Sequence, residues 1–157
     1  MTPGEELPPL TVPITRTLII AGAIASRDYQ DVHHDAEAAR AKGTPDIFMN
    51  ILTTSGLVGR YVTDYVTGRL GLNAVLRRVS IRLGVPSYPG DVLVLTGRIL
   101  SVDERAIENE RVVENECVVE SERVIEISVA GTNRLGRHVT ATVAVASPVP
   151  PASRTAP

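Results

Sequence analysis

The sequence of 157 residues has few of the side chains that bind nucleic acids or form disulfides. It has no tryptophan, four tyrosines and one phenylalanine, so a platform on which bases could stack is not expected. The net charge of −2 gives no electrostatic reason to bind nucleic acid or an anionic membrane. The single cysteine, Cys117, cannot form an internal disulfide, which favours a reducing, cytoplasmic location. No apolar run approaches the roughly 20 residues that cross a bilayer.

Proline is concentrated at the two ends of the chain. Residues 1–13 hold four prolines and show no hydrophobic periodicity, so we expect a flexible N-terminal arm or an extended entry segment. This segment also lacks the basic start and the apolar centre of a signal peptide. Residues 148–157 are rich in Pro, Ala and Ser, which predicts a disordered tail. Residues 14–147 remain as one domain, and an apolar content of 43% is enough for a sizeable core.

The first part of this domain is expected to hold a strand, a loop and a short helix. β-branched side chains are frequent from Thr15 to Ile24, which is typical of a strand. A polar loop follows from Asp28 to His33. Asp35 has the side chain of a helix N-cap and Gly43 is a typical helix end, so a short helix is expected between them.

A longer helix is predicted next. Pro45 and Asp46 are typical of a helix start, and apolar residues recur at three- and four-residue spacing over residues 47–65. Gly56 and Gly59 lie inside this helix, where each costs about 1 kcal/mol relative to alanine. We therefore expect a sheet or a ligand to approach the helix closely at these two positions.

The rest of the chain is typical of strands connected by turns. Three acidic six-residue repeats occupy residues 107–124. An even period is compatible with a strand, so we interpret the repeats as an insertion, either a lengthened hairpin or a mobile acidic segment. Cys117 is an ordinary position of the second repeat and not a candidate nucleophile, since no histidine is near it in the sequence. The predicted strands are residues 74–83, 92–102, 125–130 and 138–146, with turns at 86–91 and 131–136.

This order of elements predicts an α+β architecture. One helix and one antiparallel sheet can bury each other only if the sheet curves around the helix, and that arrangement is the hotdog fold. Such a sheet has an open edge and leaves one flank of the helix exposed. We therefore expect two hotdog domains to pair.

Groups capable of proton transfer are concentrated in residues 26–35. Asp28 and His33 are five residues apart, so a turn can bring the carboxylate and the imidazole together. Imidazole titrates near neutral pH, and a carboxylate can orient a water and stabilise the imidazolium. This pair suits the addition of water to a double bond conjugated with a thioester carbonyl. Free backbone N–H groups at the start of the long helix, around Asn50, can donate to the developing enolate oxygen.

Structural roles are the alternative for these residues. An aspartate and a histidine at this spacing also occur by chance, and Asp31 or Asp35 can simply cap a helix. The adjacent histidines, His33 and His34, rarely hold a metal without further ligands, so no metal site is predicted.

Four other polar residues have side chains capable of catalysis or binding. His138 lies alone in a late strand, where a structural role is favoured. Thr54 and Ser55 have no base at helical spacing, so a nucleophile is not supported. Arg27 could bind a phosphate, but a surface role is favoured.

The segment Asp28-Tyr29-Gln30-Asp31-Val32-His33-His34-Asp35 resembles the motif of MaoC-type hydratases, Asp-x-Asn-Pro-aliphatic-His-x-Asp. Residues 27–35, 46–53 and 60–64 are also similar to the small MaoC-like subunit of the actinobacterial steroid side-chain enoyl-CoA hydratase. The similarity covers residues 15–146 apart from the acidic repeats. It implies that Asp28 and His33 are the catalytic pair. It also implies that Met49 and the backbone N–H of Asn50 contact the substrate, where the family often has His-Gly.

The resemblance further implies the reaction and the partners. The implied substrate is a CoA thioester of a steroid with an unsaturated side chain, hydrated during cholesterol catabolism without a cofactor. The implied assembly is an α2β2 heterotetramer with a larger MaoC-like subunit, which carries a domain of unknown function and links the complex indirectly to an aldolase.

Two other functions remain open. A hotdog thioesterase usually has a carboxylate on the central helix, and residues 47–63 contain none. A non-catalytic subunit could complete the acyl-CoA pocket of its partner, but such a subunit would have no need of Asp28 and His33 together.

Overall fold

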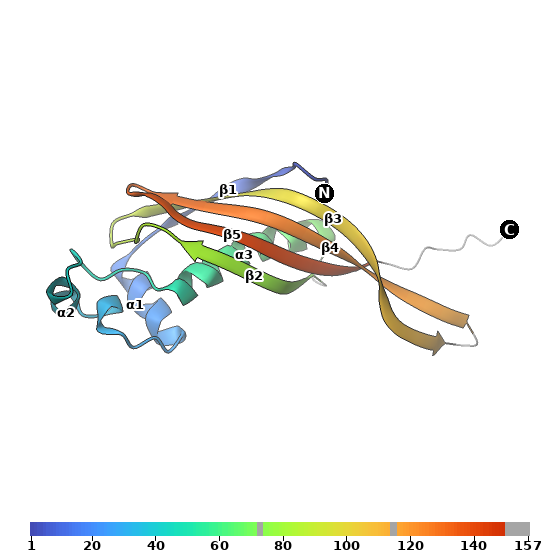
Figure 1. Ribbon diagram of the computed structural model, residues 1–157, viewed down its shortest axis with the longest axis horizontal. Helices are drawn as coiled ribbons and strands as arrows, with labels where there is room; N and C mark the ends of the chain where they lie inside the picture. The colour runs from blue at the N-terminus through green and yellow to red at the C-terminus, as the bar shows by residue number, and fades with distance from the viewer. Residues whose placement is uncertain (72–73, 114–115, 150–157) are drawn as a thin grey trace.

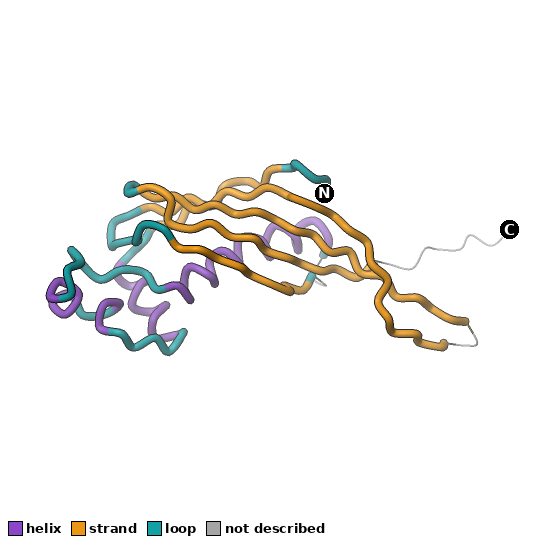
Figure 2. The backbone as a smooth tube through the Cα atoms, viewed as in Figure 1, coloured by secondary structure: helices purple, strands orange, loops and turns teal. Residues whose placement is uncertain are grey.

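The computed structural model describes the backbone of residues 1–71, 74–113 and 116–149, and the side chains of these residues except 106–120. Within these residues, five strands form one antiparallel sheet in the order β1-β3-β4-β5-β2. The long helix α3 lies across one face of this sheet (Figure 1), and the shorter helices gather near its N-terminal end (Figure 2). The strands are β1 (Glu6–Pro13), β2 (Val75–Leu83), β3 (Val92–Val113), β4 (Glu116–Asn133) and β5 (Gly136–Val149). The helices are α1 (Arg16–Ala25), the 3-10 turn η1 (Asp31–His33), α2 (Ala36–Ala41) and α3 (Ile51–Leu70).

The hydrophobic core lies between the sheet and α3. Buried residues alternate along the middle of β3 and β4, because successive side chains of a strand point to opposite faces, whereas β5 is buried at every position from Val143 to Ser147. The buried side chains of α3 recur every three or four residues, which places them on one face of the helix. The strand contribution includes Leu93, Leu95, Ile125, Ile127, Val139 and Val143, and the helix contribution includes Leu57, Val58, Tyr61, Val62 and Val66.

The predicted α+β hotdog architecture is confirmed, because a single antiparallel sheet packs around one long helix. The predicted strands at 74–83, 92–102, 125–130 and 138–146 all exist, and the observed strands extend several of them. None of the helices within the described residues is long and apolar enough to cross a membrane.

The expectation of a flexible N-terminal arm is wrong for residues 6–13, which form β1 and pair with β3. Two features allow a proline-rich segment to be a strand here. β1 is at the edge of the sheet, so it needs hydrogen bonds on one side only. Pro8 and Pro9 also fall where the register shifts between Leu7 and Leu10, a position at which the missing N–H groups are tolerated.

The predicted strand at Thr15–Ile24 is also wrong, because this segment forms α1. Thr15 is its N-cap and accepts a hydrogen bond from the backbone N–H of Leu18 at 3.0 Å. Ile19 and Ala23, four residues apart, are its buried side chains. The capping residue and this helical spacing outweigh the β-branched composition of the segment.

Both predicted helices after residue 35 exist, but only the start of the shorter one, α2, is where the sequence predicts it. α2 is confirmed, with Asp35 as N-cap accepting from the N–H groups of Glu37 and Ala38. The long helix exists but begins at Ile51, after the N-cap Asn50, rather than at residue 47. It ends at Leu70 before Gly71, whose φ of 85° favours glycine.

The two glycines inside α3 behave differently. Gly59 is approached closely, since a Cβ at this position would lie 3.3 Å from Leu76 of β2. Among the described residues nothing lies within 4 Å of such a Cβ at Gly56, so the expected approach of the sheet is wrong there, and the approach of a ligand stays a prediction.

The acidic repeats lie on the two arms of the β3–β4 hairpin. The two strands remain paired as far as Val113 and Glu116, so the backbone is that of a lengthened hairpin. The side chain of Cys117 lies outside the described residues. Of the expected tail, Pro148 and Val149 belong to β5, and residues 150–157 lie outside the described part of the chain.

Candidate active site

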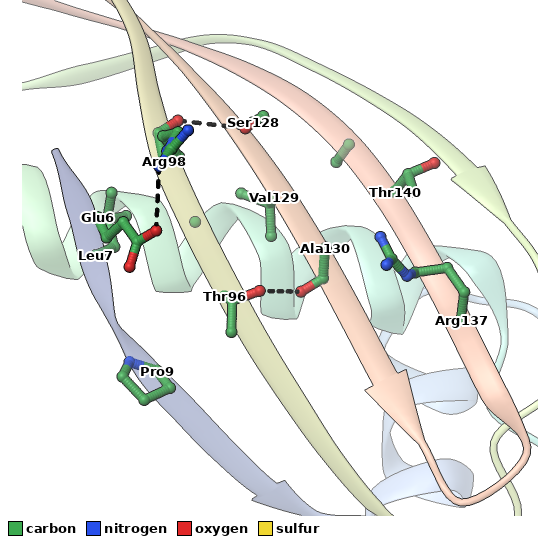
Figure 3. A pocket seen from close by; sticks show the side chains of 12 residues that line it. Glu6, Leu7, Pro9, Thr96, Arg98, Ser128, Val129, Ala130, Arg137 and Thr140 are labelled. Carbon is green, nitrogen blue, oxygen red and sulfur yellow. Dashed lines mark hydrogen bonds and ion pairs between the residues drawn. The ribbon is translucent and has the colours of Figure 1, made fainter. Parts of the chain in front are cut away.

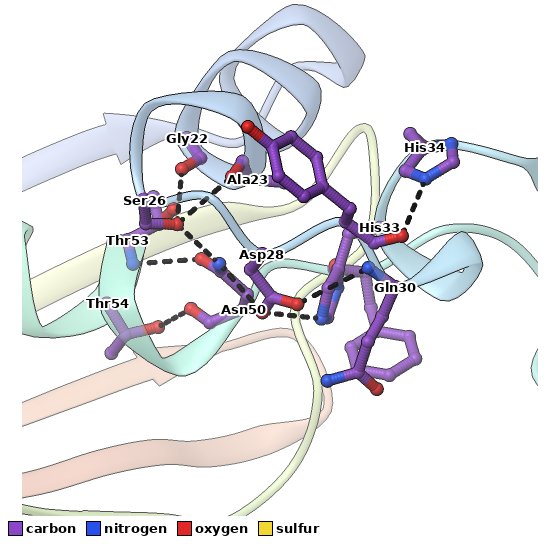
Figure 4. A network of polar contacts seen from close by, with 12 residues as sticks. Gly22, Ala23, Ser26, Asp28, Gln30, His33, His34, Asn50, Thr53 and Thr54 are labelled. Carbon is purple, nitrogen blue, oxygen red and sulfur yellow. Dashed lines mark hydrogen bonds and ion pairs between the residues drawn. The ribbon is translucent and has the colours of Figure 1, made fainter.

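The connection between α1 and α2 brings Asp28 and His33 together. α1 ends at Ala25 with Ser26 as its C-cap, and Arg27 has a φ of 55°, which turns the chain sharply. The N–H of Asp28 then donates to the carbonyl oxygen of Ala23 at 2.9 Å. The turn η1 follows and places His33 opposite Asp28, with 3.3 Å between Asp28 Oδ2 and His33 Nε2 (Figure 4).

The orientation of the His33 ring is set by its other nitrogen. Nδ1 lies 2.7 Å from the carbonyl oxygen of Phe48. A carbonyl oxygen can only accept, so Nδ1 carries a hydrogen. The Phe48 ring meets the imidazole edge-on with 5.1 Å between centroids, and the His33 side chain is 6% exposed. Nε2 faces the Asp28 carboxylate, which also only accepts, so the pair is attractive when Nε2 carries a hydrogen; in the neutral ring protonated at Nδ1, Nε2 is the basic nitrogen.

Asn50 connects the dyad to the start of α3. Its Oδ1 accepts from the N–H of Thr53 at 2.9 Å, which caps the helix. Its Nδ2 donates to Ser26 Oγ at 2.9 Å and to Asp28 Oδ2 at 3.0 Å. The side chain thus joins the end of α1, the dyad and α3, as Figure 4 shows.

Asp28 is held in its ionised form. The hydrogen bond from Asn50 is the main cause that lowers the pKa of Asp28 below its ordinary value, and Gln30 and His33 act in the same direction. Partial burial opposes the shift, since the side chain is 15% exposed.

Free backbone donors lie beside the dyad. Within the described residues, no protein acceptor pairs with the N–H groups of Asn50, Ile51 or Leu52. These are orphan donors of a helix N-terminus. The N–H of Met49, in contrast, donates to the carbonyl oxygen of Ser87 at 3.0 Å. The side chain of Met49 is buried in the core, so the residue anchors the segment and offers no donor of its own.

The remaining polar residues of the loop have structural contacts. His34 Nε2 lies 3.2 Å from the carbonyl oxygen of Tyr29, and Asp31 pairs with Lys42 at 3.2 Å. Asp35 caps α2. Within the described residues, no group of three or more His, Cys, Asp or Glu side chains is arranged to hold a metal ion.

Thr54 and His138 form a buried pair next to the site. Thr54 Oγ1 lies 3.0 Å from His138 Nε2, and both residues are almost fully buried. His138 Nδ1 donates to the carbonyl oxygen of Val85 at 2.7 Å, so Thr54 is the donor to Nε2 of the neutral ring. Burial lowers the pKa of His138, against the opposing effects of Val85 and Asp91. No local pattern signals this pair, because its members are 84 residues apart.

A hollow of about 630 Å³ lies elsewhere, on the sheet face opposite α3 (Figure 3). It is bounded by side chains of β1, β3, β4 and β5 and contains neither Asp28 nor His33. Its lining includes Glu6, Thr96, Arg98, Ser128, Arg137 and Thr140. The hollow is therefore separate from the proton-transfer groups.

Comparison with known proteins agrees with this geometry. A family model described as a MaoC-like domain matches residues 1–123. The chain belongs to the MaoC-like family. The resemblance that the loop motif indicated is thereby confirmed.

One MaoC-like relative is similar along most of its length. The chain is 41% identical over 140 residues to the 3-oxo-4,17-pregnadiene-20-carboxyl-CoA hydratase beta subunit of Mycobacterium tuberculosis, covering 89% of this chain and 92% of the relative. The crystal structure of the ChsH1-ChsH2 complex from the same organism contains a chain with 39% identity and a TM-score of 0.73. That match covers 92% of this MaoC-like chain and 96% of the other.

More distant structures share the fold. A MaoC-like dehydratase from Rhodospirillum rubrum has 17% identity and a TM-score of 0.71, with 96% of this chain and 95% of that chain covered. The (R)-hydratase from A. caviae involved in PHA biosynthesis has 14% identity and a TM-score of 0.66, with coverage of 92% and 96%. At these identities the similarity concerns the MaoC-like fold alone.

Proposed function

We propose that this MaoC-like chain is the dyad-bearing subunit of an enoyl-CoA hydratase that acts on a steroid-CoA in cholesterol catabolism. The observation that carries the proposal is the pairing of Asp28 Oδ2 with His33 Nε2 at 3.3 Å beside the free N–H groups at the start of α3. The relative at 41% identity, a steroid-CoA hydratase beta subunit by name, supports the substrate class.

The proposed reaction moves one proton through His33. Asp28 holds a water near the ring, and Nε2 takes a proton from it as its oxygen attacks the β-carbon. The π electrons of the double bond move toward the thioester carbonyl and form an enolate. The imidazolium, stabilised by Asp28, then returns the proton to the α-carbon. No cofactor is needed, because atoms and electrons balance with water alone.

The enolate oxygen needs donors that are present before the reaction begins. The unpaired N–H of Asn50 lies at the positive end of the α3 dipole, where a negative oxygen is stabilised. We assign this backbone N–H to the oxyanion contact. Met49 is left out of the assignment, because its N–H is already bonded to Ser87.

A partner subunit is part of the proposal. Large apolar side chains flank the dyad in exposed positions: Ile24 at the end of α1, and Ile51 and Leu52 in the first turn of α3. An apolar acyl group or a second chain would cover them. We propose a larger MaoC-like partner in an α2β2 assembly that associates indirectly with an aldolase. The ChsH1-ChsH2 complex, which contains a similar chain, supports a heteromeric arrangement. The single Cys117 is consistent with a cytoplasmic location.

The competing function is a non-catalytic subunit that only completes the partner's pocket. The polar arrangement argues against it, because ionised Asp28 lies 3.3 Å from Nε2 of His33, where it stabilises the imidazolium that forms when the ring takes up a proton. A thioesterase is disfavoured because α3 has no carboxylate before Asp64.

The test is a hydration assay on a panel of enoyl-CoA thioesters, including steroid-CoA substrates, with the chain co-expressed with its partner. Asp28→Asn and His33→Ala should each lower the rate roughly 10²- to 10⁴-fold without disrupting the complex. Asp31→Asn and His34→Ala are matched controls in the same loop and should leave the rate nearly unchanged. Near-normal turnover in His33→Ala would assign the chemistry to the other subunit.

A separate experiment tests the assembly. Size-exclusion chromatography compares the chain alone with the chain co-expressed with genomic neighbours that encode MaoC-like proteins. Co-elution in a larger species is expected. A fully active homodimer would contradict the heteromeric proposal while leaving the role of Asp28 and His33 intact.

A further inference from the structure

We propose that the side chain of Asn50 is a positioning residue that selects which oxygen of Asp28 faces His33. The expected effect of Asn50 on the rate rests on the proposed hydratase function. The positioning of Asp28 by Asn50 rests only on the hydrogen bonds of the site. The Asn50 carboxamide thus has a role distinct from that of the Asn50 backbone N–H.

The carboxamide has only one workable orientation. Oδ1 faces the N–H of Thr53, and the two hydrogens of Nδ2 are directed at Ser26 Oγ and Asp28 Oδ2. Rotating the amide by half a turn would put Oδ1 against a carboxylate oxygen and Nδ2 against an N–H group. Asn50 is 2% exposed, so water could not compensate for these lost bonds.

The hydrogen bond from Asn50 is accepted by the same Asp28 oxygen that faces His33. Oδ2 of Asp28 receives the Asn50 hydrogen at 3.0 Å and also lies 3.3 Å from His33 Nε2. The other oxygen, Oδ1, accepts a long hydrogen bond, 3.4 Å from the N–H of Gln30. Asn50 therefore fixes Oδ2 as the partner of the ring and leaves Oδ1 with capacity to bind the reacting water.

Ser26 completes the support from the opposite side. Its Oγ donates to the carbonyl oxygen of Gly22 at 2.7 Å, so the hydroxyl hydrogen is committed to α1. The Oγ lone pairs then face Nδ2 of Asn50. This arrangement connects the end of α1 with the start of α3, and Asp28 is held between the two helices (Figure 4).

Few side chains can replace Asn50 in this role. Aspartate would still cap α3 but would place a second carboxylate beside Asp28. Serine would still cap the helix but is too short to reach Asp28. These two substitutions remove the contact with Asp28 and retain a good helix N-cap, so they separate positioning from helix stability.

The experiment compares wild type with Asn50→Ser, Asn50→Asp and the control Thr15→Ala, which removes the N-cap of α1. The Asp28 carboxyl is titrated by ¹³C NMR in the purified full-length protein, with its signal assigned from Asp28→Asn. Asn50→Asp should raise the midpoint of the Asp28 titration by about one pH unit or more, because like charges repel. Asn50→Ser should raise it in the same direction, and Thr15→Ala should not move it.

Kinetics on the complex provide the second readout. Both Asn50 variants should lower kcat roughly 10- to 100-fold with little change in KM, and move the acid limb of the pH profile upward. An unchanged Asp28 titration in both Asn50 variants would overturn the inference, whatever the rates are. A wild-type complex with no hydratase activity would instead reject the proposed function and leave the NMR result to decide the positioning role.

Discussion

The Nδ1 atom of His33 donates to the carbonyl oxygen of Phe48 across 2.7 Å, which makes Nε2 the basic nitrogen of the neutral ring. A backbone carbonyl can only accept, so this bond favours the neutral tautomer with a hydrogen on Nδ1. We expect ¹⁵N NMR of the neutral His33 ring to show a protonated Nδ1 and an unprotonated Nε2. A protonated Nε2 in the neutral ring would rule out the base assigned to water activation. The His33→Ala spectrum identifies the signals.

The contact between α1 and α3 predicts the effect of Gly22→Ala. A Cβ at Gly22 would overlap Oγ1 of Thr53, so the helices must separate or Thr53 must rotate. We expect a loss of about 1–3 kcal/mol in the free energy of unfolding, as for other overpacked sites. The hydration rate should fall as well, because Ser26 at the end of α1 supports Asn50.

Gly56→Ala is the matched control for this variant. Gly56 also lies in a helix, but a Cβ there meets nothing within 4 Å. We expect a gain of about 0.5–1 kcal/mol in the free energy of unfolding and an unchanged hydration rate. Urea denaturation of both variants measures the difference. Equal changes in the free energy of unfolding for Gly22→Ala and Gly56→Ala would show that the contact between α1 and α3 tolerates a methyl group at Gly22.

The buried His138 predicts how stability depends on pH. Burial lowers the pKa of His138 below 6.5. Between the folded pKa and 6.5, the unfolded chain therefore binds a proton at His138 that the folded chain does not bind. The contribution of His138 is fully present above pH 6.5 and is lost as the pH falls from 6.5 toward its folded pKa. We expect the free energy of unfolding to decrease over this range.

Urea denaturation at several pH values between 5 and 7.5 measures this dependence. His138→Gln should be less stable at every pH by about 1–3 kcal/mol, because it disrupts the bonds to Thr54 and Val85, but its slope below pH 6.5 should be smaller. His34→Ala, at an exposed position, should keep the wild-type slope. An unchanged slope in His138→Gln would assign the pH dependence to other groups.

The position of Leu7 in β1, where its side chain is buried, predicts the effect of shortening it to alanine. This side chain is 4% exposed and belongs to the core. Leu7→Ala should lower the free energy of unfolding by about 2–5 kcal/mol, as for other buried leucines. Leu100→Ala, at a position that is 48% exposed, should change it by less than about 0.5 kcal/mol. A neutral Leu7→Ala would indicate that the N-terminal segment is an unpaired arm in solution.

Local patterns predicted the dyad because its geometry is local. Asp28 and His33 are joined by a short turn, and residue type and spacing are sufficient to bring them together. The role of the Asn50 side chain needed the three-dimensional structure, since its partners Ser26 and Asp28 lie 24 and 22 residues earlier. The preference of asparagine for N-cap positions was nevertheless a signal in the sequence for a helix that begins at Ile51.

Two elements were assigned wrongly for opposite reasons. At α1, the β-branched composition favours a strand, whereas the N-cap Thr15 and the four-residue spacing of Ile19 and Ala23 favour the observed helix. At β1, the prolines argue against a strand, and the strand forms only because it pairs with β3. The sequence of residues 6–13 alone does not show that the edge of β3 is available for this pairing. The strands β3 and β4 were predictable because the alternating burial along their middle is contained within each strand.

The pairing of β1 with β3 also has a consequence for folding kinetics. Glu6 and Arg98 form an ion pair across these strands although 92 residues separate them in the chain. Closing so long a loop costs entropy before any contact stabilises it, so β1 joins the sheet late rather than nucleating it. Until then the outer edge of β3 is unpaired and able to accept a strand from another molecule. Docking of β1 therefore closes the edge of β3, and the late arrival of β1 leaves the folding chain open to strand exchange and aggregation until that step.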